Sequence, residues 1–223
     1  MPVGLNRVGS RLYTLPLVSD IRSWPTRAAV QAARFGPRTE LPDTLRRVEG
    51  KRIVIHRIEP HEWALLRDMR LRALHDAPEA FGQTYENAAA EPELEWRSAA
   101  RAASAGDRRA WFFARPDGPA AEAATPADLG MVQARRRPPG DCLVFSMWVA
   151  PEARRLGVGR ALIDAAAAWA RSWGGRRIVL WVTGVNEGAQ RFYERVGFRL
   201  LSDGADAESG RAFGAFAMEL ALD

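Results

Sequence analysis

The stretch that decides the fold is SMWVAPEARRLGVGRAL, residues 146–162. It begins inside an apolar run, residues 142–149, which predicts a strand buried on both faces. Pro151 ends that strand, because proline cannot donate to a ladder. After two glycines, apolar residues return at helical spacing and predict a long helix with one apolar face. These residues are Val158, Leu162, Ala165, Ala166, Trp169 and Trp173. The glycines therefore lie where a buried strand turns into a helix N-terminus.

This turn has the properties of an anion site. The first N–H groups of a helix have no intrahelical partner, and the positive end of the helix dipole lies beside them. Gly157 and Gly159 carry no Cβ that would hold a ligand away from the backbone, and three arginines add positive charge. We interpret the loop as a cradle for a diphosphate. Its residues are Arg154, Arg155, Leu156, Gly157, Val158, Gly159 and Arg160.

Two well-known phosphate motifs fit this loop poorly. A P-loop needs Lys-Ser/Thr after its last glycine, where this chain has Arg160-Ala161. A dinucleotide fingerprint needs a further small residue at Leu162 and an acidic residue about 20 positions later, and neither is present. The pattern Arg-x-x-Gly-x-Gly at residues 154–159 resembles instead the acyl-coenzyme A loop of the GCN5-related N-acetyltransferases, the GNAT family. Taken alone, the loop leaves open a strand–helix turn without a ligand.

Length and composition are those of an ordinary globular protein. The chain has 223 residues, of which 47% are hydrophobic and 26% charged. No apolar run approaches the roughly 18 residues of a membrane helix, and the N-terminus lacks the apolar core of a secretory signal. We therefore expect a cytoplasmic protein with no membrane partner. The three histidines lack metal-ligand spacing, so no metal is expected, and the single Cys142 is interpreted as a small buried hydrophobe.

Residues 1–50 predict a flexible or weakly ordered, arginine-rich extension, followed by one folded domain over residues 51–223. The segment has eight arginines, four acidic residues, five prolines and four glycines, with no sustained periodicity. It is a solvated tail or the product of a start codon assigned too far upstream, a targeting segment, or an arm for a partner, and the sequence does not decide. A nucleic-acid partner is not favoured, because it would depend on this arm alone.

The domain alternates strands and helices in the order β-α-α-β-β-β-α-β-α-β-β. Strands are predicted at residues 53–58, 111–113, 130–133, 142–149 and 178–182, from residue 197, and at 213–220. Helices are predicted after Pro60, at residues 93–105, from residue 158, and at residues 187–196. Residues 76–82 break the first helix. Residues 135–141 are predicted to form a turn, with three arginines, Arg135, Arg136 and Arg137, at its solvated tip.

This order is similar to that of the GNAT fold, and a second motif strengthens the resemblance. Asn186 precedes Tyr193 by seven residues, and Tyr193 is followed by Gly197-Phe198, which closely resembles the family signature. The resemblance covers about residues 52–222, and residues 71–82 resemble one branch of the family. It implies an α/β (α+β) protein with a central, mostly antiparallel, twisted mixed sheet. Its fourth and fifth strands are splayed, and helices cover both faces.

The resemblance also implies a reaction. The pantetheine arm of acetyl-CoA passes between the splayed strands and bonds to the backbone of the fourth, here at Met147 and Val149. A neutral primary amine attacks the thioester directly, which agrees with Ser146 lacking a local histidine. Tyr193, whose ordinary pKa is near 10, is the expected general acid for a thiolate of pKa about 8.5, or else a core residue. Asn186 holds the pantetheine arm or caps its helix.

Other parts of the reaction are left open. His75, Glu79 and Glu86 are candidates for the general base, because they lie near the loop that in this family forms a wall of the acceptor site. Trp148 and Trp181 are candidates for the same cleft. The acceptor is an amine of a small molecule or peptide. The alternatives are acetylation of protein N-terminal or side-chain amines, or a non-catalytic acyl-CoA-binding module, and a homodimer is compatible with the sequence.

Overall fold

A computed structural model describes residues 44–48, 51–105, 108–117, 128–212 and 214–222. The described residues, from Thr44 onward, all belong to one compact unit, and the boundary of the folded domain at residue 51 stays a prediction. The expected weak order of residues 1–43 concerns a segment outside the described residues. No helix in the described part of the chain is long and apolar enough to cross a membrane.

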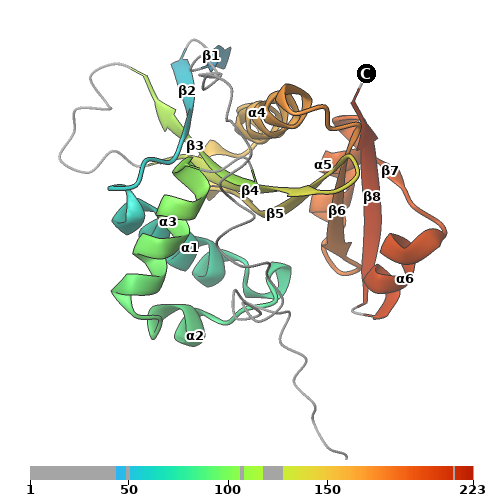
Figure 1. Ribbon diagram of the computed structural model, residues 1–223, viewed down its shortest axis with the longest axis horizontal. Helices are drawn as coiled ribbons and strands as arrows, with labels where there is room; N and C mark the ends of the chain where they lie inside the picture. Colours follow the sequence, from blue (N-terminus) through green and yellow to red (C-terminus); the bar gives the residue numbers. More distant parts are fainter. Residues whose placement is uncertain (1–43, 49–50, 106–107, 118–127, 213, 223) are drawn as a thin grey trace, which may run out of the picture. The chain divides into compact units, whose positions relative to one another are not determined.

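An eight-stranded sheet organises the described residues (Figure 1). Its strands are β1 (Thr44–Val48), β2 (Lys51–Arg57), β3 (Arg109–Pro116), β4 (Gly130–Arg137), β5 (Asp141–Val149), β6 (Arg177–Thr183), β7 (Arg199–Leu200) and β8 (Ala215–Ala221). They lie in the order β1-β2-β3-β4-β5-β6-β8-β7, and every neighbouring pair except β5 and β6 is antiparallel. Strands β2–β8 are the seven predicted strands, so β5 and β6 are the predicted fourth and fifth.

The helices cover both faces of the sheet (Figure 1). They are α1 (Trp63–Asp76), α2 (Tyr85–Ala89), α3 (Glu93–Ala105), α4 (Val158–Ser172), α5 (Glu187–Arg195) and α6 (Gly204–Ala212), with 3-10 turns η1 (Pro78–Ala80) and η3 (Pro151–Ala153). Helix α4 packs across the strands on one face, and the predicted apolar stripe supplies much of its buried side. Helices α1 and α3 pack against β5 and β3, and α6 packs against β8. The predicted GNAT-type fold is confirmed.

Strands β5 and β6 form a fork. Their parallel pairing joins Asp141–Leu143 to residues 177–179 and then stops. Further along β5, its register with β4 shifts between Met131 and Gln133, and Ser146 has a φ of 50°. This bulge bends β5, as an extra residue in one strand does. The predicted splay is confirmed. Phe145, Ser146 and Met147 are only half-buried instead of buried on both faces, because β6 has left that part of the strand.

Three elements depart from the sequence-based prediction. Strand β1 lies inside residues 1–50, where no regular structure was expected, and it pairs with β2. Helices α2 and α6 were not predicted, because both are short and alanine-rich with little apolar periodicity. The interpretation of three arginines at a loop tip is wrong, since β4 continues through Arg137 and contains all three; Arg135 and Arg137 are half-buried and Arg136 is exposed.

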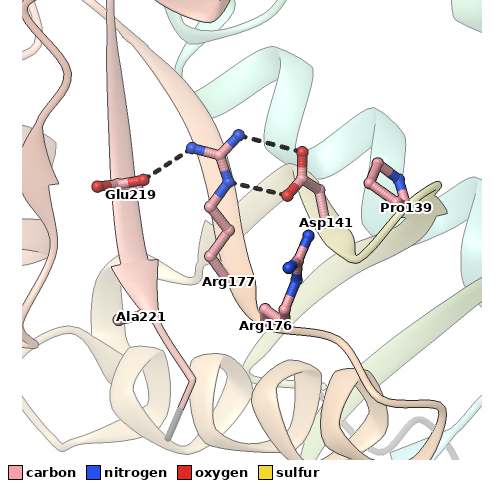
Figure 2. Close-up of a pocket in the computed structure, with 6 residues that line it drawn as sticks. All are labelled: Pro139, Asp141, Arg176, Arg177, Glu219 and Ala221. Atoms are coloured by element: carbon pink, nitrogen blue, oxygen red, sulfur yellow. Dashed lines mark hydrogen bonds and ion pairs between the residues drawn. The ribbon is translucent and has the colours of Figure 1, made fainter.

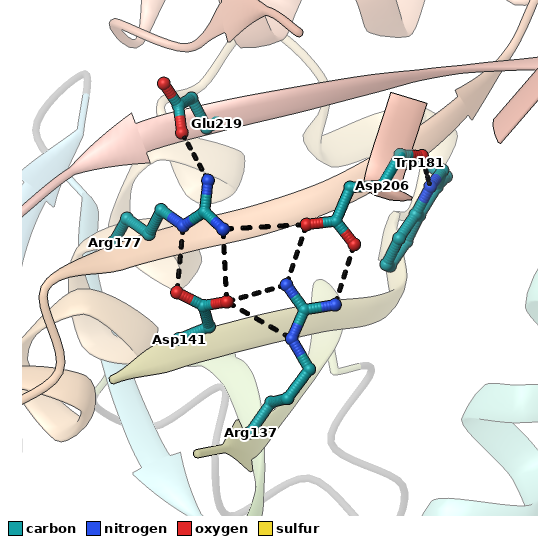
Figure 3. Close-up of polar contacts among 6 residues, drawn as sticks. All are labelled: Arg137, Asp141, Arg177, Trp181, Asp206 and Glu219. Carbon is teal, nitrogen blue, oxygen red and sulfur yellow. Dashed lines mark hydrogen bonds and ion pairs between the residues drawn. The ribbon is translucent and has the colours of Figure 1, made fainter. Parts of the chain in front are cut away.

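An ion cluster holds the closed end of the fork. The Arg177 guanidinium donates to both oxygens of Asp141 and, at 2.8 Å, to Glu219 of β8 (Figure 2). Arg137 donates at 2.7 Å to Asp141 and to both oxygens of Asp206 on α6 (Figure 3). The cluster therefore joins β4, β5, β6, β8 and α6 at the point where β5 and β6 begin. Charge-assisted, two-pronged bonds of this kind are the strong ones.

Asp141 is the carboxylate that both arginines share, so we expect Asp141→Asn to lower the free energy of unfolding at pH 7 by about 1–3 kcal/mol. Hydrogen bonds from Arg177 and Arg137 hold the pKa of Asp141 below its usual value, although burial acts in the opposite direction. A carboxylate with a lowered folded pKa stabilises the protein above its unfolded pKa of about 3.9 and loses that effect as the pH falls through the folded value.

Urea unfolding of the parent and Asp141→Asn at pH 7 and pH 3 tests this. The difference between them should narrow at pH 3. Asp203→Asn, at an exposed aspartate, is the control and should leave stability unchanged. A difference that stays the same at both pH values would contradict the proposed charge pairing.

Candidate functional site

The predicted diphosphate cradle lies where the open end of the fork meets α4. Arg155 has a φ of 66° and Gly157, the N-cap residue of α4, a φ of 77°. The first bond of the helix runs from the Ala161 N–H to the Gly157 carbonyl at 3.1 Å, so the three N–H groups before it open the helix. A left-handed residue followed by a helical turn points successive N–H groups at one concavity suited to an anion. The left-handed backbone at Arg155, costly for a residue with a Cβ, is an outlier of the kind found at ligand sites.

The three arginines of the cradle have different partners. Arg160 pairs with Asp164 at 3.1 Å along the exposed side of α4. Arg154 is ion-paired with Asp76, at the end of α1. Arg155 is exposed, and no described residue pairs with it. Arg155 is therefore the side chain most available to a diphosphate, together with the backbone N–H groups.

Arg154 anchors the cradle to the rest of the fold. Its Nε donates to the Val149 carbonyl at 3.1 Å, and its guanidinium donates to Asp76. The same Asp76 oxygen accepts from the Trp148 Nε1–H at 2.8 Å. The predicted binding residues Arg154 and Val149 are thus bonded to each other. Asp76 lies in the segment predicted to break the first helix, and no role was predicted for it.

A second contact supports the same junction. Arg72 of α1 lies 3.5 Å from Glu152 in η3, and its guanidinium stands 5.3 Å from the ring centroid of Trp148. Trp148 is consequently buried between α1 and the cradle and does not line an open cleft. The cradle is therefore fixed to α1 by a cation–π contact and two ion pairs.

Gly159 serves packing. A Cβ there would lie 2.9 Å from Phe192 Cζ on α5 and 3.4 Å from Met147 Cε on β5. The missing side chain admits these two apolar groups into the angle between α4, α5 and β5. Gly159 is buried, whereas Gly157 is exposed. Of the two glycines, only Gly157 leaves its backbone open to a ligand.

Tyr193 is buried beside this angle. Its ring lies 5.2 Å from that of Phe192 and 5.4 Å from that of Phe198, and 7% of the residue is exposed. Burial raises the pKa of its phenol well above the usual value, so the hydroxyl keeps its proton at neutral pH. Among the described residues, none makes a hydrogen bond with that hydroxyl.

Asn186 caps α5. Its Oδ1 accepts from the Ala189 N–H at 3.0 Å, so the capping alternative is observed. No described residue accepts a hydrogen bond from the amide N–H groups of Asn186.

The candidate bases are not assembled into a cluster. Glu79 and Glu86 are exposed, and His75 stacks edge-on against Tyr85 with ring centroids 6.2 Å apart. Trp181 is half-buried and stacks on Phe145 across the fork at 6.1 Å. These contacts give none of the three candidates, His75, Glu79 and Glu86, the role of general base.

Outside the cradle, the remaining points concern metal ligands, a pocket and Cys142. The described residues contain no group of three or more metal-ligating side chains. A shallow pocket of about 430 Å³ is lined by Pro139, Asp141, Arg176, Arg177, Glu219 and Ala221 (Figure 2). It lies at the start of β5, the end opposite the cradle, and three of its charged residues, Asp141, Arg177 and Glu219, are already paired. The Cys142 thiol is buried, which raises its pKa to about 12 and makes it a poor nucleophile.

Comparison with known proteins identifies the family of the chain. A family model described as the acetyltransferase (GNAT) family matches residues 73–198, more than half of the chain. The chain therefore belongs to the GNAT family of acetyltransferases.

The individual relatives resemble parts of the chain. An uncharacterized N-acetyltransferase from Methanocaldococcus jannaschii is 42% identical over 55 residues, which cover 25% of this chain and 24% of that protein. A mycothiol acetyltransferase from Propionibacterium freudenreichii is 42% identical over 66 residues, 30% of this chain and 20% of that protein. The match thus spans about a quarter or less of either relative. A GNAT-family acetyltransferase structure from Streptococcus pneumoniae has a TM-score of 0.59 at 19% identity, covering 76% of this chain and 99% of that chain, which shows the shared fold.

If the cradle binds a diphosphate, Gly157→Val should weaken acetyl-CoA binding at least tenfold, because a branched side chain would cover the N–H groups. The control is Gly174→Val at the other end of α4. Gly174 has a similar φ of 79° and no atom within 4 Å of its would-be Cβ, so the variant carries the same backbone strain. Calorimetric titration should show normal affinity in the control. Equal affinity in two folded variants would refute the cradle.

The Arg154–Asp76 pair should act as one unit. We expect Arg154→Ala and Asp76→Ala each to reduce stability, and the double variant to be about 0.5–1 kcal/mol more stable than the two single effects predict. Urea unfolding of the four proteins in the cycle measures this coupling. Additive effects would mean that the two side chains act independently.

Proposed function

We propose that the chain transfers the acetyl group of acetyl-CoA to a primary amine of a small molecule or peptide. The observation that carries the proposal is the coincidence of two features. The pairing of β5 with β6 stops after three residues, and the freed end of β5 leads directly into the cradle of N–H groups. A long ligand with a diphosphate at one end and a thioester at the other would suit this arrangement.

The proposed donor site follows the chain from the cradle inward. The diphosphate would accept from the N–H groups of residues 157–160, with Arg155 beside it. The pantetheine arm would run along β5 past Met147 and Val149, and Asn186 would donate to it from the start of α5. Because the Val149 carbonyl already accepts from Arg154, we expect the Met147 backbone to contribute more than Val149.

The proposed reaction is a direct displacement. The nitrogen of the neutral amine attacks the thioester carbonyl carbon, the carbon–sulfur bond breaks, and the sulfur leaves with the bonding electrons. Tyr193 gives its proton to that sulfur, and a base or water takes the proton lost by the amine. A raised phenol pKa still suits this step, because burial would also raise the pKa of the leaving thiol, as burial elsewhere in the chain does for Cys142.

A screen of thiol release separates the proposal from its main alternative. Acetyl-CoA is incubated with the full-length chain and a panel of amines, aminoglycosides, amino acids and peptide N-termini. Amine-dependent thiol release supports acetyl transfer. Tight acetyl-CoA binding with no thiol release from any amine would favour a non-catalytic acyl-CoA-binding module.

Tyr193→Phe should lower turnover by about 10²- to 10⁴-fold, the usual contribution of a positioned acid. The melting temperature and acetyl-CoA affinity should stay the same, because the ring is kept and the hydroxyl has no described partner to lose. Tyr85→Phe, which removes the phenol oxygen of a half-exposed tyrosine on α2, is the control and should leave turnover within threefold. Turnover near the parent's in Tyr193→Phe, with a lowered melting temperature, would instead assign the hydroxyl to the core.

A further inference from the structure

The fork has a second face, opposite α4. Phe145 of β5 and Trp181 of β6 lie on it, just beyond the last paired residues of the two strands. Their rings stack across the gap with centroids 6.1 Å apart. The Trp181 Nε1–H donates to the Asp206 carbonyl of α6 at 2.9 Å, which places both rings on the face that α6 covers (Figure 3). Both rings are half-buried and form an apolar floor beside the vertex of the fork.

The bulge in β5 separates this face from the donor side. Met147 points toward Gly159 of α4, whereas Trp148 points toward Asp76 of α1. Phe145 precedes the bulge and shares the face of Trp148. An amine that lies over Phe145 is therefore next to Ser146 and Met147. The proposed thioester would approach the same residues from the opposite face of the sheet.

Arginines line the same face of the neighbouring strands. Arg109 of β3 and Arg135 of β4 stand directly opposite each other, and Arg137 follows two residues later. Arg137 is matched by Asp141 and Asp206. No described carboxylate pairs with either Arg109 or Arg135. Two unneutralised like charges opposite each other across a sheet destabilise the fold, so this pair has a cost that its own contacts do not offset.

Arg135 is held in place for a ligand. Its guanidinium stands 5.6 Å from the ring centroid of Phe145, and the residue is half-buried. Burial, and then the charge of Arg109, lowers the pKa of Arg135. The second of these causes, the neighbouring positive charge, also attracts an anion. A guanidinium that rests on an aromatic ring keeps its N–H edge free for a planar, two-oxygen anion.

We propose that Arg135 binds a carboxylate of the acceptor, and that the acceptor is an amine that also carries a carboxylate, such as an amino acid or a peptide with a free C-terminus. This inference rests on the proposed acetyl transfer at the fork. The amine would lie over the Phe145–Trp181 floor, with its carboxylate turned toward β4. A carboxylate suits a single guanidinium better than a phosphate dianion does, because the two groups match in shape and charge.

The test uses the full chain, acetyl-CoA and amines in matched pairs. Each free amino acid is compared with its C-terminal amide and with its decarboxylated amine, and thiol release gives kcat and KM. We expect the better acceptors to carry the carboxylate. Arg135→Gln should raise KM for those acceptors about 10- to 100-fold and leave kcat and acetyl-CoA affinity nearly unchanged. The KM of amide acceptors should hardly move, and Arg135→Lys should be intermediate.

Arg136→Gln is the matched control. Arg136 is the next residue of β4, but its guanidinium stands 4.8 Å from the ring centroid of Trp173, beyond the end of α4. This variant should leave every KM unchanged. A purely structural role for Arg135 would lower the melting temperature and change all acceptors alike, which would overturn the inference.

Two further outcomes are decisive. If the best acceptors lack a carboxylate, the inference is wrong, although acetyl transfer at the fork stands. If no amine of any kind supports thiol release, the proposed function fails and this inference fails with it.

Discussion

The rest of the structure depends on how short the parallel pairing between β5 and β6 is. Only residues 141–143 pair with residues 177–179, and the ion cluster around Asp141 holds that end closed. Because the cluster also reaches β4, β8 and α6, the closed end is rigid while the other end of both strands is free to diverge. The bulge at Ser146 bends β5 a few residues beyond this fixed point, where the strand no longer pairs with β6.

The open end of the fork is held by a different set of long-range contacts. The cradle is a short connection between β5 and α4, and its backbone includes a left-handed arginine that the loop could not hold without support. That support comes from α1, through Asp76 and Arg72, and from the packing of Phe192 into the space that Gly159 leaves. Part of the positive charge of the cradle serves to hold the loop in place. Arg154 belongs to the scaffold, and the backbone N–H groups with Arg155 remain for an anion.

Local sequence patterns predicted the architecture well and the side-chain partners poorly. The buried strand, the helix from Val158 and the order of seven strands follow from apolar periodicity over neighbouring residues, and the structure confirms them. Asp76 and Arg154 are 78 residues apart, and no local pattern indicates that they meet. The arginines after residue 134 resembled a turn because prolines follow them, yet pairing with β3 and β5 extends β4 through Arg137. The roles of Tyr193, Asn186 and the cradle residues stay predictions, because they depend on a ligand that no local sequence pattern specifies.

The bulge at Ser146 connects these observations to the proposed chemistry. In a regular strand, residues alternate between faces, so a shift of one residue moves every later side chain to the other face. The extra residue here turns Met147 toward α4 and Trp148 toward α1, while Phe145 keeps the face of α6. Neighbouring residues of one strand can thus contact a donor on one side and an acceptor on the other. The positive φ of Ser146 is unfavourable for a residue with a Cβ, and its retention is understandable if both substrates must reach the same point of β5 from opposite faces.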